Sequence, residues 1–268
     1  MNDNNDLHFD NYDVDDTKQN SYYTDMNGNQ FANRAMGGAS PLTLNQFIAG
    51  TFLWMMAGLL VTFGIAMFAA VSGLVHQMAL GGSLQIVLIG ATIAELIVVI
   101  ALSAMVQKLS VGMARLLFFV YAALTGFTFS LYFMIFDLSV LILAFAITAV
   151  MFGGMAAAAK IFRLQLDSIR PYIFTGLIML IVLGVVNIFL NLAWMDMLLC
   201  YAGIAIFLAY TAYDVSRLKN YYYYYSGGDG SMLAKASIFG ALQLYLDFVN
   251  LFLRILRILA LRGSRSRD

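Results

Sequence analysis

The sequence contains little charge and little cysteine. Charged residues make up 11% of the 268 residues, whereas ordinary soluble domains contain about 25%. Cys200 is the only cysteine, so one chain can build neither an internal disulfide nor a thiolate metal site. The net charge of zero gives no electrostatic basis for binding nucleic acid. These shortages exclude a charged soluble domain, a disulfide-linked scaffold and a nucleic-acid-binding surface.

Apolar residues, in contrast, make up 62% of the chain and gather in long continuous runs. Runs of about 18 or more apolar residues are typical of membrane-spanning helices. A β-barrel is excluded, because its strands would alternate apolar and polar residues. The sequence therefore predicts an all-α polytopic membrane protein with seven spans, at residues 48–75, 83–106, 113–133, 137–160, 172–193, 195–215 and 234–260.

The seven spans form one predicted transmembrane domain, residues 48–260, between two polar ends. Residues 1–47 are rich in Asn and Asp, a composition that cannot support a core, and we interpret them as a disordered tail. Residues 261–268 form a short basic tail. No basic residue precedes Lys18 and no apolar stretch comes early, so a cleavable signal peptide is not expected.

The positive-inside rule gives the expected orientation. The connections after spans 1, 3 and 5 contain no Lys or Arg. The connections after spans 2, 4 and 6 carry the basic residues Lys108, Arg115, Arg163, Arg170, Arg217, Lys219 and Lys235. The even-numbered connections and the N-terminal tail are therefore expected in the cytoplasm. Seven full crossings would leave the basic C-terminal tail outside, against this rule. Span 7 therefore either crosses in spite of the rule, which we favour, or is re-entrant and returns the tail to the cytoplasm.

Three acidic residues lie inside predicted spans. Glu95, the only glutamate, is in span 2, Asp214 ends span 6, and Asp247 is in span 7. A charge at membrane depth costs about 2.5–3.5 kcal/mol on insertion scales, so each acid is a candidate functional residue, with a structural hydrogen bond as the alternative. Asp137 and Asp196 stand at the approximate outer edges of spans 4 and 6, and we assign them to the short outer loops as solvated turn residues.

Span 7 carries one polar stripe along an otherwise apolar helix. Its members recur at steps of three or four and are Ser237, Gly240, Gln243, Asp247, Asn250, Arg254 and Arg257. Such a face cannot point to lipid, because its polar groups would be left without partners. The stripe fits either an ion pathway or a helix held by buried hydrogen bonds.

The spacing also predicts that Asp214 and Asp247 lie at the same depth. They are equidistant from the turn signal at residues 227–230, and consecutive antiparallel helices bring such residues level. Two adjacent carboxyl groups would share one proton. Alternatively, Asp214 pairs with Arg217 one turn along the same helix. The run Tyr221–Tyr225 is expected to mark the membrane interface.

At these residues the sequence resembles the Bax-inhibitor family of membrane proteins, in its bacterial form. The strongest match is residues 238–257, which are similar to the family's last helix almost letter for letter. Shorter matches occur at residues 211–214, 102–110 and 121–126 and at Val186-Asn187. The resemblance covers about residues 45–262.

The resemblance implies a seven-helix fold in the bacterial inner membrane, with the last helix surrounded by the other six, and a pH-sensitive calcium leak. Asp214 and Asp247 would form the gate and sensor and bind calcium weakly and transiently, with no further cofactor. Glu95 would lie on the ion path, with Gln243 and Asn250 of the polar stripe. The expected partners are the lipid bilayer, calcium, protons and possible membrane proteins.

The sequence departs from the family at the second helix. Some members place an arginine at its cytoplasmic end to pair with the first aspartate. Here the only candidates for such a latch are Lys108, which is slightly displaced, and Arg217.

Two other functions fit part of the pattern. A non-transporting regulator would act by binding membrane partners. An intramembrane aspartyl protease would need two carboxyl groups on neighbouring helices, and Tyr213-Asp214 resembles one of its motifs. However, Asp247 follows Leu244-Tyr245-Leu246 rather than Gly-x-Gly, and no Pro-Ala-Leu motif is present. We therefore expect no enzymatic activity.

Overall fold

The structure is a computed structural model that describes residues 42–105, 108–162, 166–226 and 230–265. Within these ranges the chain is helical apart from short connections, with no strand, as the sequence predicts. The elements are α3 (Leu44–Val71), α4 (Leu74–Leu80), α5 (Leu84–Met105), α6 (Val111–Ile135), α7 (Leu138–Ile161), the short 3-10 helix η1 (Asp167–Ile169), α8 (Arg170–Leu190), α9 (Ala193–Tyr225) and α10 (Gly230–Arg265). Residues 1–41 of the predicted tail, Arg163, the turn at 227–229 and residues 266–268 lie outside the described residues.

Six of these helices are long and apolar enough to cross a membrane: α3, α5, α6, α7, α8 and α9. The seventh predicted span corresponds to α10, which is not among these six. It is nevertheless one unbroken helix of 36 residues, about 54 Å long. It contains no re-entrant turn.

The short helix α4 was not predicted. The predicted first span ran to residue 75, but α3 ends at Val71 and a separate helix begins at Leu74. Gly73 between them has φ 72°, a left-handed conformation that glycine adopts without steric cost. The helix therefore ends just before this glycine, although the apolar residues of the sequence continue beyond it.

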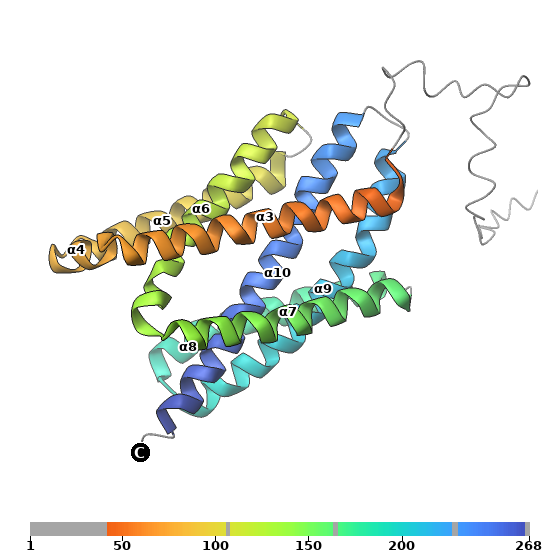
Figure 1. Ribbon diagram of the computed structural model, residues 1–268. Helices are drawn as coiled ribbons and strands as arrows, with labels where there is room; N and C mark the ends of the chain where they lie inside the picture. The colour runs from red at the N-terminus through yellow and green to blue at the C-terminus, as the bar shows by residue number, and fades with distance from the viewer. Residues whose placement is uncertain (1–41, 106–107, 163–165, 227–229, 266–268) are drawn as a thin grey trace, which may run out of the picture. The chain divides into compact units, whose positions relative to one another are not determined.

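The last helix occupies the interior of the bundle formed by Leu44–Arg265 (Figure 1). It packs extensively against α3, α6, α7 and α9, whereas α5 packs on α6 and α8 packs on α9. Consecutive residues such as Ala236, Ser237 and Ile238 are all buried, so the middle of α10 has no exposed face. The expected central position is correct, but four helices, rather than six, form its main contacts.

Polar contacts tie α10 to α3 and α6. The hydroxyl of Ser237 is 3.0 Å from that of Thr51 on α3. The hydroxyl of Thr62 on α3 donates to the carbonyl oxygen of Ala122 on α6. The same hydroxyl lies 2.7 Å from the hydroxyl of Tyr245 on α10. These bonds satisfy buried polar groups inside an apolar bundle, where an unpaired group is costly.

Candidate functional site

The carboxyl groups of Asp214 on α9 and Asp247 on α10 lie close enough to interact directly. They are 6% and 5% exposed. A carboxylate has no proton to donate, so a hydrogen bond between two carboxyl groups requires that one of them is protonated. The structure brings the two residues together, as their equal spacing from the turn predicts. The Oδ2 atom of Asp247 is buried and has no hydrogen-bond partner among the described residues.

Arg217 does not pair with Asp214 as the alternative required. Its guanidinium lies over the rings of Tyr213 and Tyr221, at 5.3 and 5.1 Å from their centroids. It attracts the carboxylate of Asp214 electrostatically, but the structure records no ion pair between them in the described residues. Asp214 instead binds the neighbouring helix.

Lys108, the other candidate latch, lies exposed in the turn after α5. The described residues contain no ion pair between Lys108 and either aspartate.

Gln243 forms a second link between α9 and α10. Its side-chain oxygen accepts a hydrogen bond of 3.2 Å from the hydroxyl of Tyr221. Gln243 precedes Asp247 by four residues, so both lie on one face of α10. The sequence assigned Tyr221 to the membrane interface with the rest of the tyrosine run, whereas its hydroxyl in fact contacts the polar stripe.

Glu95 lies apart from the aspartate pair. Its carboxylate accepts a hydrogen bond of 3.0 Å from Thr128 on α6. It also interacts electrostatically with Tyr121 and Tyr245. No hydrogen bond or ion pair joins it to Asp214 or Asp247 in the part of the chain that the structure describes.

Asn250, the third predicted path residue, donates a hydrogen bond of 2.8 Å to the carbonyl of Leu246 on its own helix. It lines a cavity of about 530 Å³ together with Tyr132 and Arg254. This cavity follows the C-terminal half of α10, beyond the aspartate pair.

Asp196 is not a solvated turn residue, contrary to expectation. Its carboxylate forms an ion pair of 2.8 Å with Arg257 of α10 and accepts a hydrogen bond of 2.8 Å from Asn187 of α8. The oxygen of Asn187 in turn accepts from the backbone of Leu192. Sequence reasoning missed this network, although Asn187 stood in a recognised motif and Arg257 ended the polar stripe.

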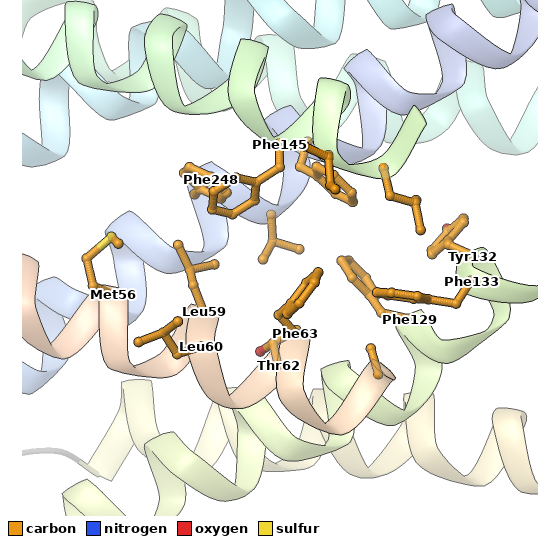
Figure 2. A pocket seen from close by; sticks show the side chains of 15 residues that line it. Met56, Leu59, Leu60, Thr62, Phe63, Phe129, Tyr132, Phe133, Phe145 and Phe248 are labelled. Atoms are coloured by element: carbon orange, nitrogen blue, oxygen red, sulfur yellow. The ribbon is translucent and has the colours of Figure 1, made fainter. Parts of the chain in front are cut away.

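A largely apolar cavity of about 260 Å³ lies between α3, α6, α7 and α10. Figure 2 shows Phe145 and Phe248 facing Leu59 and Phe63 across it. The hydroxyl group of Thr62, which lines the cavity, is already hydrogen-bonded to Tyr245. No charged side chain lines the cavity, so it offers an ion no strong ligand.

No cluster of three or more His, Cys, Asp or Glu side chains suitable for a metal ion occurs in the described residues. The aspartate pair supplies two carboxyl groups, fewer ligands than the six to eight oxygens of a tight calcium site.

The bundle and its buried carboxyl pair define a polytopic α-helical membrane protein with a titratable contact between its last two helices. The model of the family described as "Inhibitor of apoptosis-promoting Bax1" matches residues 44–264, and the chain belongs to that family. This confirms the resemblance drawn from the motifs.

Bacterial relatives agree with the family assignment. The chain is 40% identical over 215 residues to the inner membrane protein YbhL of Escherichia coli K12, covering 80% of this chain and 91% of the relative. It is 38% identical over 230 residues to an uncharacterized protein of Deinococcus radiodurans, covering 84% and 94%. With the apolar helices, the similarity to the Escherichia coli inner membrane protein supports an integral inner membrane protein.

Proposed function

We propose that this protein is a pH-sensitive calcium leak channel whose gate is the Asp214–Asp247 pair. The observation that carries the proposal is the close approach of these two buried carboxyl groups on adjacent helices. Membership of the Bax-inhibitor family supports it through the resemblance described above.

The shared proton explains how pH would act on the gate. With one proton, the pair holds α10 against α9. When the second carboxyl group ionises, two like charges about 4 Å apart repel by about 4 kcal/mol at an effective dielectric constant of 20. The helices then separate at this level, and the flux rises with pH. Carboxylate oxygens are hard ligands that suit calcium, and two of them give weak, transient binding.

We place the ion path along the polar face of α10, with Gln243 beside the pair, Asn250 further along the helix, and Glu95 on α5. Each presents an oxygen that a partly dehydrated cation could contact. Calcium is the permeant ion and protons are the regulator, with no organic cofactor.

We propose that α10 is a seventh crossing and that the N-terminus and the aspartate pair lie on the cytoplasmic side. The length of α10 exceeds the roughly 30 Å of the hydrocarbon core. Arg257 pairs with Asp196 in the first turn of α9, whereas Asp247 lies beside Asp214 in the C-terminal half of that helix, as an antiparallel crossing requires. The cost of its polar face is offset by burial against four other helices.

We assign no enzymatic activity, because the second aspartate lacks the glycine motif of the intramembrane proteases. A regulator that binds membrane proteins is the alternative function. Flux of calcium into dye-loaded proteoliposomes separates the two. Wild type and Asp137→Asn, which changes an exposed acid outside the site, are expected to conduct above empty liposomes. Absence of flux at every pH would overturn the channel and favour the regulator.

A further inference from the structure

A cavity of about 460 Å³ beside the C-terminal half of α9 is not used by the proposed channel. It is lined by Arg170 at the start of α8, by Arg217 and Asn220 of α9, and by four tyrosines of α9. All of these side chains can donate hydrogen bonds, and no Asp or Glu lines the cavity. The chemistry of the lining therefore fits an anion.

The two arginines bring positive charge that the described residues do not neutralise by an ion pair. Arg217 is held in place because its guanidinium lies over the rings of Tyr213 and Tyr221. Its planar fork is thereby fixed before any ligand arrives, which lowers the entropy lost on binding. Arg170 is exposed and approaches from the neighbouring helix.

We propose that this cavity binds a phosphate group, supplied by the headgroup of an anionic phospholipid or by free phosphate. Guanidinium groups bind phosphate oxygens through two parallel charge-assisted hydrogen bonds. The headgroup is the favoured source, because the cavity lies at the ends of two helices that can span a membrane. Tyrosine rings gather at this level of a bilayer, as Tyr223 and Tyr224 do here on the exposed side of α9.

The test compares wild type with Arg170→Gln, Arg217→Gln and the double variant. The matched control is Lys219→Gln, which removes an equal charge from the same helix outside the cavity, where Lys219 lies over the ring of Tyr223. Binding of phosphatidylglycerol and of phosphatidylcholine to the detergent-solubilised protein is measured by native mass spectrometry. A second arm measures binding of inorganic phosphate alone.

Each arginine substitution is expected to weaken phosphatidylglycerol binding roughly tenfold, the effect of losing one hydrogen bond to a charged group. Lys219→Gln and phosphatidylcholine binding should show no such change. If inorganic phosphate alone binds with the same dependence on both arginines, and the lipid does not, the site is confirmed with free phosphate as its source. Equal lipid binding by wild type and the double variant, without phosphate binding, would overturn the proposal. Arg170→Gln alters an exposed side chain and should fold, as circular dichroism will check.

Discussion

Arg257 near the end of α10 forms a 2.8 Å ion pair with Asp196 in the first turn of α9. Asp214 lies further along α9, in its C-terminal half, so the last two helices are linked at two separate levels. Arg257 is 56% exposed and Asp196 is 23% exposed, and exposed ion pairs contribute only about 0–1 kcal/mol. This link orients the helices and adds little to their stability.

A double-mutant cycle with Asp196→Asn and Arg257→Gln should therefore give a coupling free energy below about 1 kcal/mol. The measurement is thermal unfolding in detergent for the two single variants and the double variant. A coupling of several kcal/mol would show that this pair, rather than the buried core, anchors α10.

Gly126 of α6 should not accept a larger side chain. A Cβ atom there would lie 2.6 Å from the backbone carbonyl oxygen of Thr62 on α3, which cannot move aside as a flexible side chain would. Gly126→Ala is expected to destabilise the protein by about 1–3 kcal/mol, the usual cost of overpacking a core.

Gly153 of α7 is the matched control, because a Cβ atom there meets nothing within 4 Å. Gly153→Ala should leave the midpoint of thermal unfolding unchanged or raise it. Equal loss of stability in both variants would contradict the tight approach of α3 and α6.

The proposed orientation predicts on which side of the membrane each connection between helices is exposed. Cys200 is fully buried, so introduced cysteines at exposed positions can be labelled selectively. Asp137→Cys should react with a membrane-impermeant maleimide in intact cells, and Lys219→Cys only after the membrane is permeabilised. The reverse pattern would invert the assignment.

Arg217 should tune the pH response although it forms no ion pair. Its positive charge attracts the carboxylate of Asp214 across one turn of α9. Arg217→Gln removes the favourable charge, so the second ionisation and the rise in calcium flux are expected at higher pH. Lys219→Gln, two residues further along α9 and exposed, should leave the profile in place. A shift to lower pH would contradict this electrostatic role.

Much of the fold was predictable because long apolar runs locate membrane helices directly. The contact between Asp214 and Asp247 was predictable too. Two antiparallel helices joined by one turn place residues that are equally far from the turn at the same level. Gly73 shows the limit of such patterns, because a left-handed residue breaks the helix without interrupting the apolar run.

The contacts of Asp196 and Tyr221 could not be read from the sequence. Each depends on which face of α9 turns toward α10, and that rotation is set by packing among helices far apart in the chain. The same reason separates Lys108 from the aspartate pair. The expectation that six helices surround α10 failed because α5 and α8 pack on its neighbours.

The measurement that tests the gate most directly is the pH dependence of calcium flux in proteoliposomes, between pH 5 and pH 8, for wild type, Asp214→Asn and Asp247→Asn. An asparagine amide can donate permanently to the remaining carboxylate and has no proton to lose. Flux is expected to rise with pH in wild type and to lose this dependence in both variants, while Asp137→Asn behaves as wild type. An unchanged pH profile in either buried variant would contradict the shared proton as the gate.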